Sequence, residues 1–140
     1  MKYAIVVGRF YEDLAERLVT SATRVFSLAG AEAVDVFDVP GAYELPFAAQ
    51  ELANTGTYGG IACLGAVIRG ETSHYDHVCE ESARGIMDVM LRTGVPCSFG
   101  VLTVDSMEQA IARSGGGKRD SGEHAAEAVL ALVRLREAVA

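Results

Sequence analysis

The chain has 140 residues, of which 50% are hydrophobic and 22% are charged, a composition typical of one globular domain. It excludes an intrinsically disordered chain, and it leaves too little length for two domains with separate cores. The formal net charge of −7 argues against general binding of nucleic acid or of anionic membranes. An anionic ligand would therefore need its own local cluster of cationic side chains. We expect a single domain over residues 1–140.

The cysteines and the apolar runs indicate a cellular compartment. Cys63, Cys79 and Cys97 are far apart and odd in number, which disfavours a disulfide framework or a zinc ribbon and suits a reducing compartment. The longest apolar stretch, residues 61–68, is too short to cross a bilayer. The apolar run after Lys2 ends at Gly8, too early for the core of a signal peptide. We expect a cytoplasmic protein without a membrane segment.

Four short apolar runs alternate with amphipathic segments along the chain. The apolar runs are rich in β-branched residues or bounded by glycine and proline, which predicts buried strands, and the apolar residues between them recur at helical spacing. In chain order we predict a strand at Tyr3–Val7, a helix at Glu12–Ala29, a strand at Ala33–Val39, a helix at Tyr43–Asn54, a strand at Gly60–Ile68, a helix from Thr72 or Ser73 to Thr93, a strand at Val95–Leu102, a short helix from Ser106 to Arg113 and a helix at Glu123–Val139.

Particular residues support the helix boundaries. Pro46 stands in the first turn of its helix, where a missing N–H costs little. Ser106 and Gln109 have the spacing of a capping box. Leu135 is expected to face the core from the last helix, together with Val129 and Leu132. The glycine-rich residues 114–122 predict a mobile loop.

The order of elements predicts the fold. Near-continuous apolar strands that alternate with amphipathic helices are typical of a parallel sheet covered on both faces. Right-handed crossovers then leave few topologies. We predict a three-layer α/β fold of the flavodoxin-like type, with a four-stranded parallel sheet in the order 2-1-3-4 flanked by helices.

Candidate site residues follow the predicted strands, and ligands of open α/β sheets bind beyond the carboxyl ends of strands. Residues 65–74 are the richest segment. Gly70 permits a sharp turn, and the amides after it lie at a helix N-terminus, which stabilises an anion such as phosphate. Thr72 adds a hydroxyl donor, and His74 can exchange protons near neutral pH. An ordinary strand–loop–helix connection explains the same segment equally well.

Other candidates also have a structural alternative. Phe10 could stack on a planar ligand, although a ring that closes the core over the first helix explains it somewhat better. Glu44 is favourable at a helix start in any case, and it could accept hydrogen bonds from a polyol. Arg113 is either a helix-end cation or a phosphate clamp. The acidic, His and Cys side chains of residues 71–81 point in different directions on a helix, so we expect no metal site.

Several motifs together resemble one known family over essentially the whole chain. The motifs are Gly8–Phe10, Pro40–Pro46, Gly65–Thr72, His74 and Phe99–Thr103. They look like those of 6,7-dimethyl-8-ribityllumazine synthase. The resemblance implies an enzyme of riboflavin biosynthesis that condenses 5-amino-6-ribitylamino-uracil with 3,4-dihydroxy-2-butanone 4-phosphate, releasing phosphate and water. It implies no metal and no organic cofactor.

The resemblance also implies roles for individual residues. The catalytic residue is His74, which shuttles protons. The implied substrate-binding residues of the same subunit are Phe10 on the pyrimidine ring, Ala42, Tyr43 and Glu44 around the pyrimidine and ribityl groups, Val67 and Ile68 through their backbones, and Gly70, Glu71 and Thr72 at the phosphate. Phe99 and Arg113 are implied to act from a neighbouring subunit, with Arg113 on the phosphate.

The resemblance thus implies a site between the subunits of a pentamer, and we expect a homo-oligomer built from pentamers. The length of the loop at residues 114–122 matches shell-forming relatives, so we expect an icosahedral shell, with a free pentamer or a decamer as the alternative. The chain begins close to its first strand, without the N-terminal extension that adds to a neighbour's sheet in many relatives, and this counts against the shell.

Three positions depart from the family pattern. The family usually has Asn where this chain has Tyr11, and many members have a lysine and an asparagine at the positions of Ser121 and Asp120. Arg119 and its neighbour Lys118 could compensate. The departures leave open a paralogue that binds a flavin- or lumazine-sized ligand with little turnover. A generic nucleotide-binding regulator fits less well, because it requires neither Arg113 nor a shared site.

Overall fold

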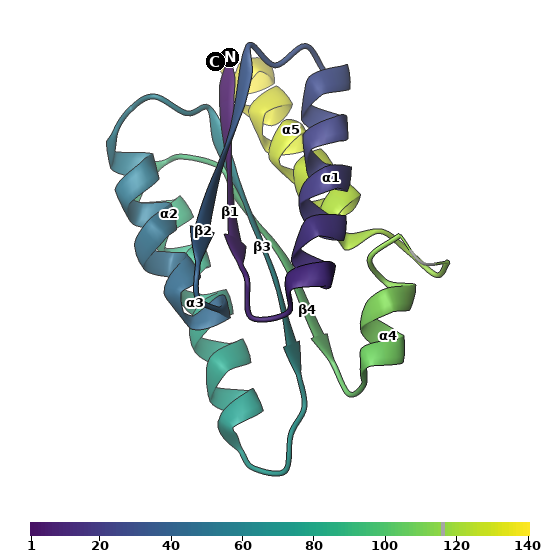
Figure 1. Ribbon diagram of the computed structural model, residues 1–140. Helices are drawn as coiled ribbons and strands as arrows, with labels where there is room; N and C mark the ends of the chain where they lie inside the picture. Colours follow the sequence, from purple (N-terminus) through teal and green to yellow (C-terminus); the bar gives the residue numbers. More distant parts are fainter. Residues whose placement is uncertain (116) are drawn as a thin grey trace.

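The computed structural model describes residues 1–115 and 117–140 as a four-stranded parallel sheet with helices on both faces (Figure 1). The strand order is β2-β1-β3-β4, which confirms the predicted topology. The elements are β1 (Lys2–Gly8), α1 (Glu12–Leu28), β2 (Ala33–Val39), the 3₁₀ helix η1 (Ala42–Glu44), α2 (Leu45–Asn54), β3 (Gly60–Ile68), α3 (His74–Thr93), β4 (Cys97–Val104), α4 (Met107–Ala112) and α5 (Ser121–Val139). No helix in the described part of the chain is long and apolar enough to span a membrane.

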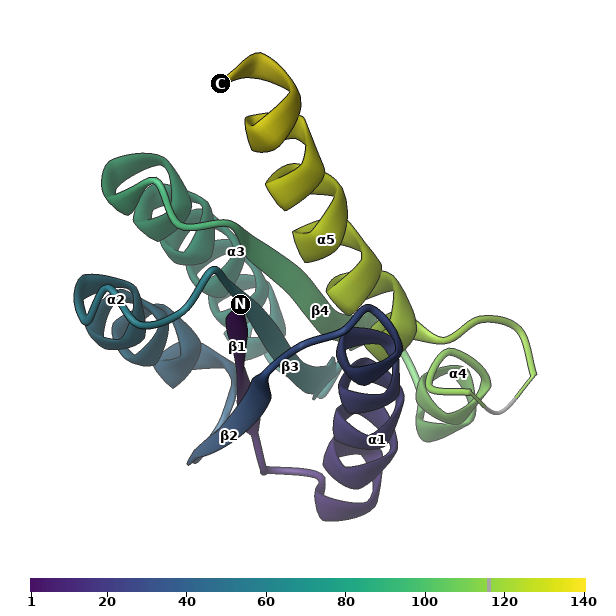
Figure 2. The ribbon, with the colours of Figure 1, turned by 90° about the horizontal axis from the view of Figure 1, so that it is seen from above.

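Helices cover both faces of the sheet, α1 and α5 on one and α2 and α3 on the other (Figure 2). Each face has its own buried core. Successive side chains of a strand point to opposite faces. Tyr3, Ile5 and Val7 of β1 therefore pack against α1 and α5, whereas Ala4 and Val6 pack against α2 and α3. Alternate burial on both faces explains why the central strands are apolar at nearly every position, and it fixes the register of the sheet.

The fourth strand lies two residues later than the sequence predicts. We predicted Val95–Leu102, but the ladder with β3 runs from Cys97, opposite Ile61, to Val104, opposite Ile68. The residue before Cys97 is Pro96, which has no N–H to donate and contributes only its carbonyl oxygen to the amide of Ile61, at 2.8 Å. The carboxyl ends of β3 and β4 therefore lie level with each other, opposite one another in the ladder.

The helix starts show how capping sets boundaries. α5 begins at Ser121, two residues before the predicted start, because the Asp120 carboxylate accepts a hydrogen bond from the Glu123 amide at 3.2 Å. Within α5 the predicted inward position of Leu135 is wrong, since its side chain is 58% exposed and Val133 is buried instead. The predicted second helix divides into η1 and α2, with Pro46 in the first turn of α2 as expected.

Two further capping predictions have mixed outcomes. Ser106 caps α4 by accepting from the Gln109 amide at 3.2 Å, as predicted, but the Gln109 side chain accepts from the Asp105 amide, not from that of Ser106. Ser73 occupies the cap position of α3 without a side-chain hydrogen bond.

The predicted mobile loop of residues 114–122 includes residue 116, which lies outside the described residues.

Candidate active site

A cavity of about 550 Å³ opens at the carboxyl ends of β1 and β3, between the segment after β2 and the start of α3. We term it the rim pocket. Its place is the one at which open α/β sheets bind ligands. It is lined by Phe10, Tyr11, Pro40, Gly41, Ala42, Tyr43, Glu44, Ala66, Val67, Ile68, His74, His77 and Val78. The structure thus brings together most of the candidate residues that follow the first three strands.

The wall formed by Phe10 and Tyr11 is aromatic. The Phe10 side chain is 74% exposed, so the alternative in which its ring closes the core is wrong. Its ring meets that of Tyr11 edge to face, with the centroids 4.9 Å apart. One face of Phe10 is therefore open to stack on a planar ligand in the rim pocket.

The opposite wall is formed by the segment after β2. A Cβ atom at Gly8 would lie only 2.8 Å from the carbonyl carbon of Gly41, so the ends of β1 and β2 can approach this closely only with glycine there. The Gly41 amide donates to Glu44 Oε1 at 3.0 Å, which holds the turn that places Ala42 and Tyr43 at the pocket. The Glu44 carboxylate has further acceptor sites, so its structural role leaves it able to receive hydroxyl groups.

The third wall is the end of β3 and the start of α3. His74 is exposed, is the first residue of α3 and lines the rim pocket. Its amide donates to Thr72 Oγ1 at 3.3 Å. Gly70, Glu71 and Thr72 are exposed and precede it, with only Ser73 between, although they are not among the lining residues. Within residues 1–115 and 117–140, the amides of residues 70–73 donate to no protein acceptor, so they are available to an anion.

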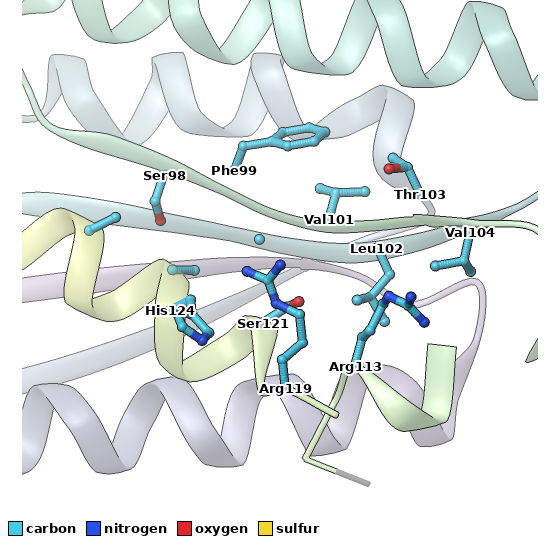
Figure 3. A pocket seen from close by; sticks show the side chains of 13 residues that line it. Ser98, Phe99, Val101, Leu102, Thr103, Val104, Arg113, Arg119, Ser121 and His124 are labelled. Carbon is cyan, nitrogen blue, oxygen red and sulfur yellow. The ribbon is translucent and has the colours of Figure 1, made fainter. Parts of the chain in front are cut away.

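Phe99 and Arg113 line a different cavity, of about 420 Å³ (Figure 3). We term it the edge pocket, because it lies along β4, an edge strand of the sheet, beneath α5 and the segment that joins α4 to α5. Its lining residues are Ser98, Phe99, Gly100, Val101, Leu102, Thr103, Val104, Arg113, Arg119, Ser121, His124, Ala125 and Ala128. The candidate residues therefore separate into two groups within one chain.

The edge pocket is a cationic region of an acidic chain. Arg113, Arg119 and His124 reach it, and none of the residues that line it is Asp or Glu. The neighbouring Asp120 turns towards α1, where it accepts from the Ser21 hydroxyl at 2.6 Å. Arg113 donates to the Gln109 carbonyl oxygen at 3.2 Å, a bond that orients its guanidinium without neutralising it. This arrangement suits a phosphate or another oxyanion.

Sequence reasoning missed two of the histidines that line these pockets. His77 follows His74 by three residues and so lies on the same helix face, a spacing that could have identified it. His124 reaches the edge pocket from the first turn of α5, and hydrophobic spacing alone does not indicate that this face of the helix borders a pocket. In the described part of the chain, no three His, Cys, Asp or Glu side chains come together as a metal-ligand group.

Comparisons with known proteins agree over the whole chain. Residues 1–137 match the family model described as 6,7-dimethyl-8-ribityllumazine synthase. The chain is 43% identical to the protein of that name from Ruthia magnifica, over 99% of this chain and 87% of the relative. It is 46% identical to the one from Salinibacter ruber, over 96% and 87%. The chloroplastic enzyme of Spinacia oleracea is 45% identical, over 97% of this chain and 62% of the relative.

Proposed function

The chain belongs to the 6,7-dimethyl-8-ribityllumazine synthase family, and we propose that the rim pocket of one subunit and the edge pocket of its neighbour together form its active site. The protein is a transferase of riboflavin biosynthesis, which condenses 5-amino-6-ribitylamino-uracil with 3,4-dihydroxy-2-butanone 4-phosphate. The separation of Phe99 and Arg113 from His74 within one chain carries the proposal. A site that uses all three requires a second chain.

Unpaired edges and exposed apolar side chains support a homo-oligomer. β2 and β4 are the edge strands of the sheet, and an unpaired edge is normally protected. Phe37 on β2 is 37% exposed, Phe47 on α2 is 69% exposed and Leu91 on α3 is 73% exposed. Side chains of this kind are common in contacts between subunits. A head-to-tail contact that closes on itself gives a ring. The ring proposed here is a pentamer in the cytoplasm, and the pentamers assemble into an icosahedral shell.

The rim pocket would hold the pyrimidine substrate. Phe10 stacks on the ring, Tyr43 and Ala42 border it, and Glu44 accepts hydrogen bonds from the ribityl hydroxyls. The backbones of Val67 and Ile68, at the end of β3, supply polar contacts to the edge of the ring. These groups are neutral or acidic, which suits an uncharged substrate with many hydroxyl groups.

The phosphate of the second substrate would lie against the start of α3. The amides of Gly70, Glu71 and Thr72 are available to it, and Arg113 of the neighbouring subunit supplies a charged fork. Arg119 of the same neighbour lines the edge pocket and adds a second cation. The phosphate is then close to His74, where the leaving group must depart.

His74 would act on the protons of each step. The 5-amino group attacks the ketone carbon, and water leaves as the imine forms. A proton then leaves C3 as phosphate leaves C4, which forms an enol with a double bond between C3 and C4. The enol takes up a proton at C4 and loses its hydroxyl proton, so that C3 becomes a ketone. The ribitylamino nitrogen finally attacks the new ketone, and a second water leaves as the ring closes. Holding both substrates together lowers the barrier most, and one positioned proton carrier adds about 10²–10⁴-fold.

Two measurements test the proposal. Purified protein with both substrates should form the fluorescent lumazine faster than the spontaneous reaction does. Binding of lumazine without such turnover would favour the paralogue. Mass photometry at micromolar concentration should find an assembly of pentamers. A monomer would contradict the shared site, whereas a stable free pentamer would contradict only the shell.

A further inference from the structure

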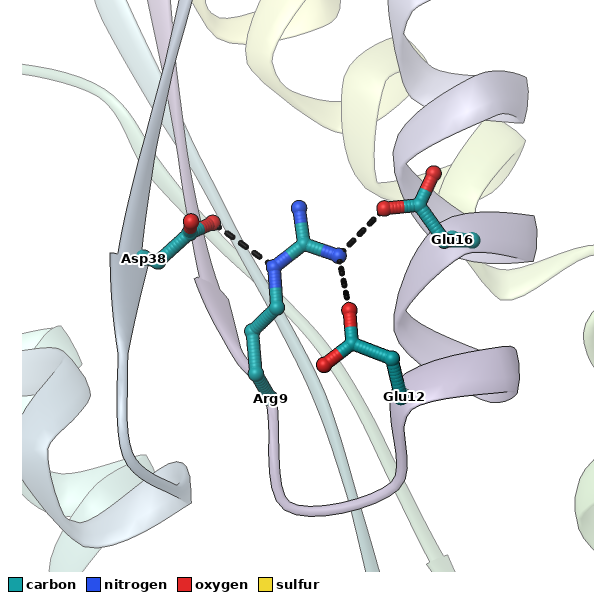
Figure 4. A network of polar contacts seen from close by, with 4 residues as sticks. All are labelled: Arg9, Glu12, Glu16 and Asp38. Carbon is teal, nitrogen blue, oxygen red and sulfur yellow. Dashed lines mark hydrogen bonds and ion pairs between the residues drawn. The ribbon is translucent and has the colours of Figure 1, made fainter.

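Arg9 is the centre of a polar network where β1 and β2 end, and it directly precedes Phe10 of the rim pocket (Figure 4). Its Nε donates to Asp38 Oδ1 at 2.7 Å, and its Nη1 donates to Glu12 Oε1 at 2.8 Å and also to Glu16. The Arg9 side chain is only 20% exposed, whereas each of the three carboxylate side chains is more than half exposed. One guanidinium thus joins the end of β1, the first two turns of α1 and the end of β2.

The backbone of Arg9 is fixed at the same place. Its amide donates to the Val39 carbonyl oxygen at 2.9 Å, which extends the β1–β2 ladder by one bond. Just before it, Gly8 is in close contact with the backbone of Gly41. Arg9 is therefore held by both its main chain and its side chain where the two strands end.

The network connects the two chain segments that form opposite walls of the rim pocket. Phe10 and Tyr11 lie between Arg9 and Glu12, so their short loop is tied at both of its ends. On the other side, Asp38 stands two residues before Pro40, where the wall that leads to Glu44 begins. Movement of either wall relative to the other would have to stretch a bond to Arg9.

We infer that Arg9 is a positioning residue, which holds the Phe10 wall and the Pro40–Glu44 wall at the separation that the pyrimidine substrate requires. The assignment rests on the proposed function, because it gives Arg9 a part in that same site. Arg9 itself does not line the rim pocket. It acts through Phe10 and through the segment after β2.

Charge repulsion makes the network sensitive to loss of the cation. Glu12, Glu16 and Asp38 all point at one guanidinium (Figure 4), and without it three like charges would face one another. Like charges this close repel, and the repulsion is screened least at low salt. Removal of Arg9 should therefore open the mouth of the pocket as well as free its loop.

A similar arrangement recurs at the other pair of strands. Arg69 follows β3, its amide donates to the Val104 carbonyl oxygen at 2.9 Å, and its Nε donates to Asp105 at 2.8 Å. Its guanidinium also lies 4.2 Å from the centre of the Tyr75 ring on α3. An arginine at the end of each inner strand thus ties that strand to its outer neighbour and to the following helix. The recurrence indicates that such arginines organise the carboxyl end of the sheet. The arginine at β1, Arg9, lies next to the aromatic wall of the rim pocket.

An ion pair that only stabilised the fold would behave differently. Exposed pairs contribute little to folding. Loss of such a pair away from both pockets should leave the kinetic constants of the folded enzyme unchanged. A positioning residue changes KM and kcat of enzyme that remains folded and assembled. Arg24 provides a matched control, since it bridges α1 to Asp120, the N-cap of α5, at 3.9 Å and to Glu123 in the first turn of α5 at 3.8 Å. It lines neither the rim pocket nor the edge pocket.

The kinetic test uses the assembled enzyme at low and high salt. Arg9→Ala should raise KM for the ribitylaminouracil by about 10-fold and lower kcat, since a small misplacement of a substrate can cost up to 10²-fold. Arg9→Lys should recover part of the loss, because it restores the charge but not the fork. Arg24→Ala should match the wild type. Unchanged KM and kcat in folded Arg9→Ala would overturn the proposal.

A second readout needs no activity. Hydrogen–deuterium exchange in Arg9→Ala should rise in residues 8–12 and 38–44 and stay unchanged in β3 and β4, and unchanged exchange in the first two segments would overturn the proposal. If Arg9→Ala fails to fold, Asp38→Ala removes only the tie to β2, because alanine has no side-chain acceptor for Arg9 Nε, and it should give a smaller change confined to residues 38–44. If wild-type enzyme forms no lumazine, the proposed function fails, and the exchange data still decide whether Arg9 holds the two walls.

Discussion

The rim pocket and the edge pocket contain complementary chemistry. The rim pocket combines an exposed aromatic ring, backbone groups and His74, and no arginine or lysine lines it. The edge pocket contains two arginines and no carboxylate, although the chain as a whole carries a net charge of −7. One cavity suits a planar polyhydroxylated molecule, and the other suits an oxyanion.

A single chain therefore does not bring the two kinds of recognition together. The reaction joins a pyrimidine to a phosphate ester, so it needs both at one place. Both pockets are open at the surface, and the edge pocket lies along an edge strand, where another subunit can approach. Variants that damage one pocket at a time can therefore test whether the two act as one site.

The largest effect is expected in the rim pocket at His74. His74→Ala should lower kcat by about 10- to 10³-fold while substrate affinity stays similar, because the variant loses a proton carrier but keeps the walls of the pocket. Single-turnover lumazine formation, with substrate binding measured in parallel, checks this. His77→Ala, one helical turn away in the same pocket, should have a clearly smaller effect on kcat. Wild-type turnover in His74→Ala would remove His74 from the mechanism.

The equivalent change in the edge pocket should affect the other substrate. Arg113→Ala should lower kcat/KM for the butanone phosphate by about 10- to 150-fold, since a hydrogen bond to a charged group contributes about 1.5–3 kcal/mol. Affinity for the pyrimidine should change little. Steady-state kinetics with each substrate varied in turn separates the two effects. Arg92→Ala, an exposed arginine in the last turn of α3, is the control for loss of one positive charge.

The sequence predicted the fold well because buried parallel strands are apolar at nearly every position. Boundaries failed where one local contact decides them, as at Pro96 before β4 and at the Asp120 cap of α5. The rim pocket was largely predictable, since the residues that follow parallel strands must meet at one edge of the sheet. Its aromatic wall was not, because only the structure shows whether the Phe10 ring is buried or exposed.

The edge pocket was harder to predict. The approach of Arg119 and His124 to Arg113 depends on how the chain returns from α4 to α5 and on the rotation of α5 about its axis. Neither follows from hydrophobic spacing. The assignment of Phe99 and Arg113 to a neighbouring subunit came from resemblance alone, and it stays a prediction.

Mixed assemblies test directly whether the two pockets cooperate across subunits. Chains carrying Phe10→Ala have a damaged rim pocket, and chains carrying Arg113→Ala have a damaged edge pocket. Random co-assembly should restore about a quarter of the shared sites, because an intact rim pocket then meets an intact edge pocket. Co-assembly of Phe10→Ala with His74→Ala is the control, since every rim pocket in that mixture is damaged. Equal activity in the two verified mixtures would contradict the shared site.

The smallest effect is expected at Arg119, which tests whether the edge pocket contains one functional cation or two. Arg119 lines the pocket but is exposed, so water and salt screen its charge more than that of the half-buried Arg113. Arg119→Ala should raise KM for the butanone phosphate by about 3- to 10-fold at low salt, and by less at high salt. Lys118→Ala should have no such effect, because Lys118 is adjacent in sequence but does not line the pocket. Ser121→Lys in the Arg119→Ala background should recover the affinity, since it places a cation on the same lining. Equal KM values for Arg119→Ala and Lys118→Ala would mean that Arg113 alone provides the charge for the phosphate.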